Sequence, residues 1–509
     1  MQNVVIIGVG ECVQPVPENL ANAQSPLDMM ERAARLALSD CGIDNIGSVI
    51  DEFAVVRTFS DSSPRFKSPL GDPLNPPRAL AQRIGINPAQ AIYSEMGGDI
   101  PQVLVNEMSR KITSGACRAA LLVGGEALAN QKALLRAGHK VDWSDETDGP
   151  VETRALNLFD LVETTQINHQ LFHIPTIYTL LENVRRARLG MDRQSYIKQC
   201  AELFAPMSSV AASHPTAMFK TAFSADAICD ITKENSSITD IYSRALVSKD
   251  GVNQGAAVLL MSEDLAISLG VNPEKFVYPT AGSHVADLAV MTREDLGQSK
   301  AMQLAYESVV DLAGLSVSEI DMFDMYSCFP IAVFSALENL GLSTKDTRSL
   351  TVTGGLPFFG GPGNNYSMHA IVNVVERLRQ SKTGKALIGA NGGFLSKHAV
   401  GLYGREAPKD GWAESDKSKL GEIVKSQNSP LIVDNVDGTA RVESYAVEYN
   451  RKGPVNAYIV GRLDNNARFL SKLDHDQLSA VAHDTQTDIL GARVNVSHAK
   501  NINISRLLD

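Results

Sequence analysis

The sequence has none of the segments or short motifs that mark membrane proteins, secreted proteins and many metal or nucleotide enzymes. It contains no run of about 18 or more apolar residues, so we expect no transmembrane helix. The first 20 residues lack the charged start of a signal peptide. HExxH, CxxC and phosphate-loop patterns are all absent. We therefore expect a cytoplasmic protein with no metal site and no membrane partner.

Basic charge and organised cysteine are also scarce. The net charge is −11, which argues against a dedicated nucleic-acid binder, because such proteins usually carry a basic face. Six cysteines are scattered without metal-type spacing, which is typical of reduced thiols. They are Cys12, Cys41, Cys117, Cys200, Cys229 and Cys328.

What is present is a globular composition in a long chain. The chain has 509 residues, 44% of them hydrophobic and 21% charged, so two to four domain-sized units are expected. The segment "IIGVGEC" (6–12) has only two glycines of a dinucleotide-binding turn. We interpret it as a core strand followed by a turn.

The chain contains one α/β unit twice. Residues 29–56 and 301–327 each hold an amphipathic helix that ends near a glycine, Gly42 or Gly314, and leads into a strand. Residues 93–128 and 358–395 each run from a glycine turn through a helix to a buried strand. Four matched elements in one order indicate a duplication. Helices that alternate with short apolar strands predict largely parallel sheets covered by helices.

Two further regions differ in character from the duplicated unit. An insert at about 129–250 is richer in polar and aromatic residues, and we expect it either to fold over the core as a cap or to be a decorative insertion. From about residue 408, alternating apolar and polar residues around "NRKG" (450–453) predict a hairpin in a separate β-rich domain, such as a small barrel.

Three segments carry a family resemblance. They are "VNQGAAVLLMSE" (252–263), "GGLPFFGGP" (354–362) and "DMYSCFP" (324–330). With the duplication and the insert, they resemble the thiolase superfamily over residues 1–405. The extra C-terminal region resembles the thiolase-like proteins of type 1, which are related to sterol-carrier-protein-type thiolases and are often called acetyl-CoA acetyltransferases.

The resemblance implies an α/β fold of five layers, α-β-α-β-α, with a loop or cap domain and a small OB-like barrel. It also implies that the chain has four parts. The N-terminal half is 1–128 plus 251–270, the cap is 129–250, the C-terminal half is 271–407, and the added domain is 408–509. Members of the superfamily act on acyl-CoA in lipid metabolism, so the resemblance implies CoA or an acyl-CoA as ligand and no further cofactor.

The residues that carry thiolase chemistry are missing at the matching positions. The resemblance implies a nucleophilic Cys at Gly97 or a neighbour, an activating His at Gly361, a second Cys near Gly389 and a His at Tyr326. Acyl transfer through Cys needs a thiolate beside a base, and glycine supplies neither. We therefore expect neither ordinary thiolysis nor Claisen condensation.

The glycine turns remain as candidate substrate-binding elements. Backbone N–H groups at helix N-termini can hold a thioester oxygen, although such turns also serve folding alone. The candidate substrate-binding residues are Gly97, Gly98, Gly360, Gly361, Asn391 and Gly392.

Three side chains are candidate catalytic residues, each with a structural alternative. Tyr326 either donates to a carbonyl oxygen or fills the space of the lost His. Cys328 is either a relocated nucleophile or a buried structural thiol. His398, beside Lys397 in a glycine-rich turn, is either a general base or a hydrogen-bonded His.

Other residues are weaker candidates. Asp99 is predicted to cap the helix that follows the first glycine turn. His369 is expected on a helix body, and Lys220 is either a phosphate ligand or a solvated lysine.

Three functions stay open from the sequence. The first is an acyltransferase-type enzyme of altered mechanism, and the second is a non-catalytic CoA-binding protein. The third is a scaffold or accessory protein that acts through its C-terminal β domain. A homodimer or a protein partner at that domain is possible under each of them, and no nucleic acid is expected.

Overall fold

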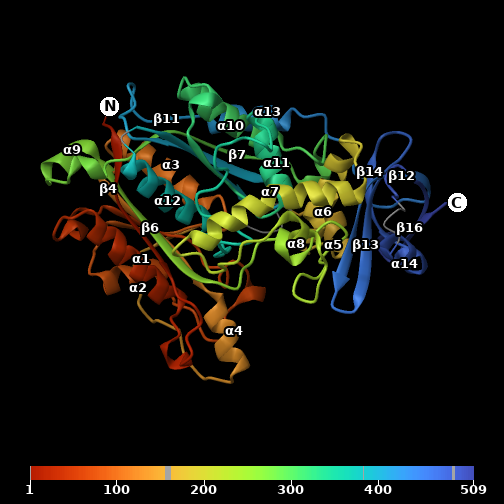
Figure 1. Cartoon of the computed structure of the whole chain (residues 1–509), viewed down its shortest axis with the longest axis horizontal. Coiled ribbons are helices and arrows are strands. Elements are labelled where there is room, and N and C mark those ends of the chain that lie inside the picture. Colours follow the sequence, from red (N-terminus) through yellow and green to blue (C-terminus); the bar gives the residue numbers. More distant parts are fainter. Residues whose placement is uncertain (1, 155–161, 382, 484–487, 509) are drawn as a thin grey trace.

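The computed structural model describes residues 2–154, 162–381, 383–483 and 488–508, which form two sheets and a closed barrel (Figure 1). Residues 155–161 of the predicted cap and 484–487 of the predicted C-terminal domain lie outside the described residues.

The first sheet has the strand order β1-β6-β4-β2-β3-β5. Its elements and the helices around it are β1 (Val4–Val13), α1 (Pro26–Asp40), β2 (Glu52–Val55), α2 (Pro76–Ile84), β3 (Gln90–Tyr93), α3 (Ile100–Thr113), β4 (Ala119–Ala127), α4 (Leu128–Arg136), β5 (Glu152–Thr153), β6 (Asn253–Ser262) and α9 (Glu263–Ser268).

The second sheet has the order β11-β7-β10-β9-β8. Its elements and helices are β7 (Tyr278–Ala286), α10 (Lys300–Leu312), β8 (Met322–Met325), α11 (Pro330–Asn339), α12 (Tyr366–Gln380), β9 (Lys385–Gly392), β10 (Lys397–Gly404) and β11 (Ala413–Glu414).

The sheets are mixed, and the expectation of largely parallel sheets was wrong. β6 runs antiparallel to both β1 and β4, and β10 runs antiparallel to both β7 and β9. Parallel pairs remain where helices connect the strands, as in β2–β3, β2–β4 and β8–β9. β10 follows β9 through a short turn, which can join only antiparallel strands.

The layers follow the predicted order α-β-α-β-α (Figure 1). α3 and α12 lie between the two sheets, and their apolar side chains share one core with both. α1 and α2 cover the outer face of the first sheet, and α10 and α11 cover that of the second. The five layers that the resemblance implies are therefore present.

Glycines end the repeated helices as predicted. α1 and α10 stop just before Gly42 and Gly314, which have φ of 75° and 61°. This left-handed conformation suits glycine because it has no Cβ.

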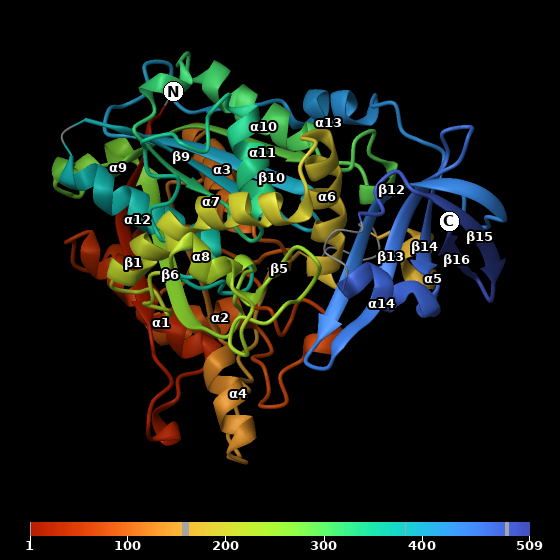
Figure 2. The same cartoon turned by 45° about the vertical axis from the view of Figure 1, so that its right-hand side comes forward.

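The insert forms helices that lie between the second half and the barrel (Figure 2). They are α5 (Thr164–His169), α6 (Ile174–Arg188), α7 (Arg193–Ser213) and α8 (Ala225–Cys229). α6 contacts both α11 and a strand of the barrel, β12 (Gly438–Asn450).

The C-terminal region is a barrel with the strand order β12-β13-β14-β16-β15. β12 and β13 form the hairpin predicted at "NRKG", with Asn450 paired to Gly453. The remaining elements are α13 (Lys417–Lys425), β13 (Gly453–Arg462), β14 (Arg468–Leu473), α14 (His475–His483), β15 (Arg493–Ala499) and β16 (Ile502–Leu507).

Buried polar contacts fix the barrel to the rest of the chain. The Arg186 side chain in α6 pairs with Asp488 at 2.5 Å. Arg468 in β14 pairs with Glu443 at 2.8 Å and donates to the carbonyl oxygens of Met291 and Arg293. The fully buried side chains of Arg186 and Arg468 therefore connect the barrel to the segments beside it. Of the helices in the described ranges, none has the length and apolar character needed to cross a membrane.

Candidate functional site

The two halves meet at the N-termini of α3 and α12. The Gly97 N–H donates to Asn364 Oδ1 at 2.9 Å, and Ser367 Oγ donates to the Gly98 carbonyl oxygen at 2.7 Å. The Asn364 amide also donates to the Arg57 carbonyl oxygen at 2.8 Å. The two predicted glycine turns therefore form one joint between the halves.

An ion pair occupies the position where the resemblance implies a nucleophile. A Cβ added at Gly97 would overlap Asp99 Oδ1 and lie 3.0 Å from Lys397 Nζ. A Cβ added at Gly392 would also overlap Asp99 Oδ1. Asp99 is fully buried. Its carboxylate therefore fills the space between two of the predicted substrate-binding glycines.

Asp99 stands at the N-cap position of α3, as predicted, but its side chain makes no capping hydrogen bond. Instead its carboxylate lies 4.0 Å from Lys397 Nζ and 3.5 Å from His284 Nε2. Burial raises the pKa of Asp99, but Lys397 and His284 together hold this pKa below its ordinary value. The carboxylate is therefore ionised at neutral pH inside the protein.

The other positions implied by the resemblance are filled in the same way. A Cβ at Gly361 would overlap Ser248 Oγ, and one at Gly389 would overlap the Tyr306 hydroxyl. At Gly360 a Cβ would lie 2.6 Å from Gln254 Oε1. The three positions where the resemblance implies Cys, His and Cys are thus glycines packed against polar atoms of other residues.

Tyr326, Cys328 and Asn391 lie together, as expected. A Cβ at Gly98 would overlap the Tyr326 hydroxyl and lie 2.6 Å from the Asn391 carbonyl oxygen. Asn391 Nδ2 donates to Cys328 Sγ at 3.5 Å and to the Tyr178 hydroxyl at 3.0 Å. Tyr326 and Cys328 are each only 8% exposed, so both residues are largely buried.

These side chains are poor acids, bases and nucleophiles where they stand. Burial raises the pKa of the Cys328 thiol to about 12, although Tyr178 and Asn391 bond to it. Burial also raises the pKa of Tyr326 well above its ordinary value, and the nearby Cys328 and Asp99 add to the effect. Both groups are neutral at physiological pH. Their catalytic roles stay predictions, and their surroundings disfavour a Cys328 thiolate.

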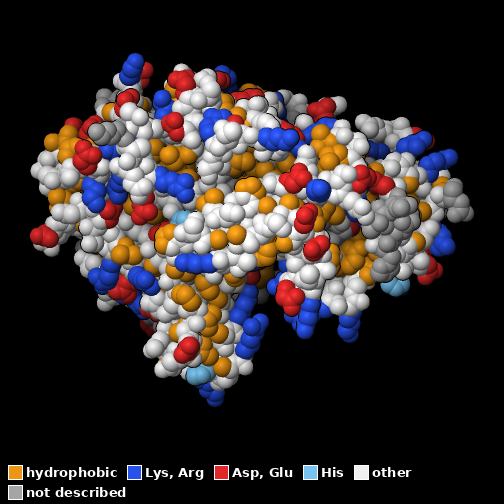
Figure 3. All heavy atoms as spheres, in the orientation of Figure 1, with side chains coloured by type: hydrophobic (Ala, Val, Ile, Leu, Met, Phe, Trp, Pro, Cys, Tyr) orange, Lys and Arg blue, Asp and Glu red, His pale blue; other side chains and the backbone are white. Residues whose placement is uncertain are grey.

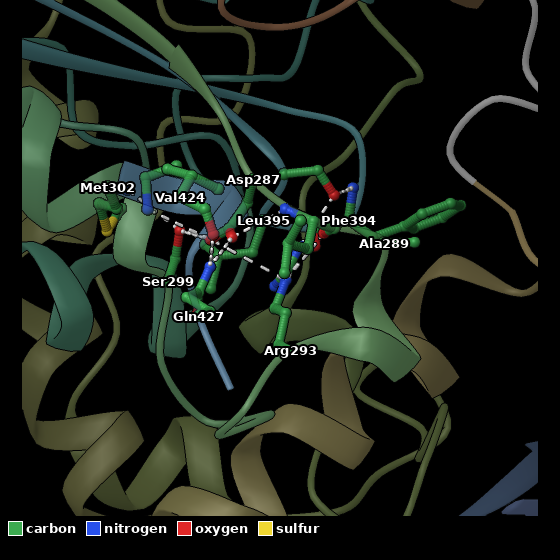
Figure 4. A network of polar contacts seen from close by, with 12 residues as sticks. Asp287, Ala289, Arg293, Ser299, Met302, Phe394, Leu395, Val424 and Gln427 are labelled. Atoms are coloured by element: carbon green, nitrogen blue, oxygen red, sulfur yellow. Dashed lines mark hydrogen bonds and ion pairs between the residues drawn. The ribbon is translucent and has the colours of Figure 1, made fainter. Parts of the chain in front are cut away.

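His398 belongs to a different network, at the outer side of the second sheet. Its Nε2 lies 3.0 Å from Ser299 Oγ and 3.1 Å from the Leu395 carbonyl oxygen. Ser299 Oγ donates to Asp287 Oδ2 at 2.5 Å, and Gln427 donates to Asp287 Oδ1 at 3.2 Å. Figure 4 shows Ser299, Gln427 and Arg293 pointing toward Asp287.

This network suits structure better than catalysis. Burial lowers the pKa of His398 to about 4, although the neighbouring Asp287 favours the protonated ring. A general base works best with a pKa near the operating pH, so His398 is a weak base here. Its role as a base stays a prediction. A hydrogen bond of the ring connects β10 to Ser299, the N-cap residue of α10.

The weaker candidates have structural partners. His369 Nδ1 lies 2.6 Å from Glu11 Oε1, and both side chains are buried between α12 and β1. The exposed Lys220 donates to the Pro215 carbonyl oxygen at 2.9 Å. Within the described ranges, no group of three or more His, Cys, Asp or Glu side chains could hold a metal ion.

Two residues near the joint were not found from the sequence. Glu126, at the end of β4, accepts a hydrogen bond from the Phe59 N–H at 2.7 Å and packs against Gly363. Burial raises its pKa to about 8, so it is mostly protonated at neutral pH. Lys249 is joined to Gly361, whose N–H donates to the Lys249 carbonyl oxygen at 2.8 Å. Glu126 follows Gly125 near the end of β4, and this position was the available signal for it.

Comparison with known proteins identifies the family of the chain. It is 35% identical, over 99% of both chains, to the crystal structure of a monomeric SCP2-thiolase-like protein type 1 from Mycobacterium smegmatis, with a TM-score of 0.84. The chain belongs to the family of SCP2-thiolase-like proteins of type 1. Residues 419–501 match the family described as the thiolase-like protein type 1 additional C-terminal domain. The predicted resemblance is therefore confirmed.

More distant relatives share parts of the sequence or the fold. A mitochondrial acetyl-CoA acetyltransferase from Bos taurus is 29% identical over 164 residues, which is 32% of this chain and 35% of that enzyme. A 3-ketoacyl-CoA thiolase from Klebsiella pneumoniae is 34% identical over 107 residues, which is 21% of this chain and 26% of that enzyme. The matches thus span about a quarter to a third of these enzymes. The fold is also that of an acetyl-CoA acetyltransferase from Syntrophomonas wolfei, at 16% identity and TM-score 0.56 over 80% of this chain and all of that one.

Proposed function

We propose that this chain binds a CoA thioester where its two halves meet and catalyses neither thiolysis nor Claisen condensation. One observation carries the proposal. The positions that would need Cys, His and Cys are Gly97, Gly361 and Gly389, and polar atoms of other residues fill their side-chain space. Loss of the reactive groups is therefore coupled to repacking of the site, which a single substitution does not reverse.

Three features support binding. The N-termini of α3 and α12 still converge, and backbone N–H groups at such ends favour a negatively polarised oxygen. The Tyr326 hydroxyl and the Asn391 carbonyl oxygen, which can hydrogen-bond to a ligand, lie beside Gly98 at the N-terminus of α3. Figure 3 shows a notch between the part that carries α4 and the barrel, with Lys and Arg side chains on both sides. Positive charge at such a notch suits the phosphates of CoA.

The states of the candidate catalytic groups support a non-catalytic role. With the pKa of Cys328 near 12 and that of His398 near 4, the site has neither a thiolate nor an effective base from these residues at neutral pH. The proposal requires no cofactor besides the bound thioester.

Calorimetric titration with CoA, acetyl-CoA and a medium-chain acyl-CoA tests the proposal. We expect micromolar binding of at least one ligand by the full chain. Cys328→Phe places a larger side chain beside Tyr326 and is expected to abolish binding. Cys229→Phe makes the same change on the half-buried α8 and should preserve binding. Absence of heat with all three ligands at high concentration would reject the proposal, as would equal loss in the two variants.

A second candidate is a scaffold that acts through the barrel. A polar hollow of about 270 Å³ lies where the barrel meets the preceding segment, and its lining includes Glu294, Asn428, Arg462 and Asn466. Such a hollow offers a partner both hydrogen-bond donors and acceptors. The role gains support if Asn466→Trp removes a protein partner while CoA binding stays unchanged.

We further propose that the chain is a monomer rather than the homodimer considered from the sequence. β5 pairs with β3 at the edge of the first sheet, through Ile92–Glu152 and Tyr93–Thr153. β5 is the edge strand and has only two residues, so it offers few backbone groups to a strand from a second copy. The relative from Mycobacterium smegmatis is described as monomeric. Light scattering should give the mass of one chain at all concentrations, and the mass of two chains would contradict the proposal.

A further inference from the structure

Lys249 is a half-buried lysine at the wall of the candidate site. Its Nζ lies 4.9 Å from the centre of the Phe219 ring and 5.8 Å from that of Phe358. Within the described ranges, no ion pair joins it to a carboxylate, and the adjacent Asp250 pairs instead with Lys132 at 3.0 Å. In place of a carboxylate, the amine has two aromatic rings beside it.

Backbone hydrogen bonds fix Lys249 beside the residues of the joint. The Ser248 N–H donates to the Cys328 carbonyl oxygen at 3.1 Å, and the Lys249 N–H donates to that of Leu356 at 3.3 Å. The Gly361 N–H donates in return to the Lys249 carbonyl oxygen. The amine is therefore held on a short, anchored segment next to Cys328 and Gly361.

The surroundings of the amine favour its neutral form. Burial lowers the pKa of Lys249, and the positive charge of Arg244 lowers it further. A lysine amine in apolar surroundings is more often unprotonated, and the unprotonated amine is the nucleophile. Lys249 thus differs from the exposed Lys220 of the neighbouring segment, which donates to the Pro215 carbonyl oxygen.

We propose that Lys249 is a site of acyl transfer, where the ε-amine takes the acyl group of a CoA thioester bound at the joint. This inference rests on the proposed function. The amine nitrogen attacks the thioester carbonyl carbon, the carbon–sulfur bond breaks, and a carbon–nitrogen bond forms. The nitrogen loses one proton and the departing CoA thiolate takes it. The products are an Nε-acyl-lysine and free CoA, with no oxidant or reductant.

The step occurs once per chain and changes the site. The amide is uncharged, and its acyl chain is apolar, so it can lie against the Phe219 and Phe358 rings. An amide is also no longer a nucleophile. Acylation of Lys249 therefore marks protein that has been exposed to CoA thioesters, and it leaves the site more apolar.

Mass spectrometry of the full chain after incubation with acetyl-CoA tests the inference. We expect one acetyl group per chain, mapped to Lys249, at a rate at least about tenfold above that of Lys220, because binding holds the thioester beside the amine. Excess CoA should slow the reaction at Lys249 and leave that at Lys220 unchanged. Lys249→Arg should lose the label, whereas Lys220→Arg should keep it.

Other outcomes overturn the inference and separate it from the proposed function. Acetylation of Lys249 no faster than that of Lys220, or insensitive to CoA, contradicts it. If calorimetry detects CoA binding under the same conditions, only the acyl-transfer step fails. If calorimetry detects no CoA binding either, the proposed function fails as well. Acetyl phosphate, which lacks the CoA moiety, serves as a control and should show a smaller preference for Lys249 over Lys220 than acetyl-CoA does.

Discussion

The carboxylate of Asp99 and the ammonium group of Lys397 lie 4.0 Å apart, in the space that a side chain at position 97 would need. The two residues come from different halves of the duplicated fold, α3 and β10. Here an ion pair between the halves fills the space of the reacting cysteine that the resemblance implies at position 97. Four predictions follow from this packing and from the groups around it.

Restoring a cysteine at position 97 should not restore thiolysis. In Gly97→Cys the new side chain overlaps Asp99 Oδ1, and the backbone φ of 147° at Gly97 is strained for any other residue. Overpacking of this kind costs about 1–3 kcal/mol. Chemical denaturation should show this loss, whereas Gly421→Cys, where a Cβ meets open space, should change stability little. A stable Gly97→Cys protein with thiolase activity would refute the packing argument.

Removing the positive partner of Asp99 should destabilise the fold strongly. Lys397→Met leaves a buried carboxylate with only His284 nearby, and loss of one partner of a buried pair costs about 3–5 kcal/mol. Because the pKa of Asp99 is lowered in the folded protein, its contribution is present above its unfolded pKa and is lost as pH falls through its folded pKa. The loss of folding stability in Lys397→Met should therefore be smaller at acid pH.

The double variant Asp99→Asn with Lys397→Met gives the control for that prediction. It removes both charges and should recover much of the stability lost in Lys397→Met, as urea denaturation at neutral pH would measure. If the double variant is as unstable as the sum of the single variants, the two side chains do not act as a pair.

His398 should make the protein sensitive to mild acid. Its pKa is about 4 in the fold, against 6.5 ordinarily, so the unfolded chain binds the extra proton between these values. Stability should fall as pH drops from about 6.5 to about 4, by about 3 kcal/mol from this group. In His398→Gln the pH dependence should flatten relative to the exposed-site control His139→Gln. Parallel pH profiles for the two variants would count against this account.

Cys328 should react slowly with alkylating reagents despite its slight exposure. With its pKa raised to about 12 it has almost no thiolate at neutral pH, because thiolate falls about tenfold with each pH unit below the pKa. Peptide mapping after iodoacetamide treatment should show labelling at the half-exposed Cys229 well before Cys328. Preferential labelling of Cys328 would instead support the predicted nucleophile.

Much of the fold was predictable because its signals are local and occur twice. The helices that end at Gly42 and Gly314 follow from amphipathic periodicity and a glycine stop, and the "NRKG" hairpin follows from alternation. The antiparallel placement of β6 and β10 was not predictable from the same pattern. It depends on how strands distant in sequence order themselves within a sheet, which periodicity does not report.

The position of the candidate site was predictable, but the residues that fill it were only partly so. Family motifs place Gly97, Gly361 and Tyr326 at the joint, and the geometry brings their segments together. Asp99 and Lys397 fill the space of the side chain implied at position 97. They come from segments about 300 residues apart and show no shared pattern in the sequence. Lys397 and His398 were predicted in a turn, but they begin strand β10, and the His398 ring lies in a network with Ser299 that the sequence pattern does not show.

Product analysis tests the central claim most directly. The full chain is mixed with CoA and acetoacetyl-CoA, at protein concentrations that calorimetry has shown to bind ligand, and the thioesters are measured by mass spectrometry. The account predicts no acetyl-CoA above the level of the protein-free control. Acetyl-CoA that forms in proportion to the protein, and disappears with Tyr326→Phe or Cys328→Ala, would contradict it.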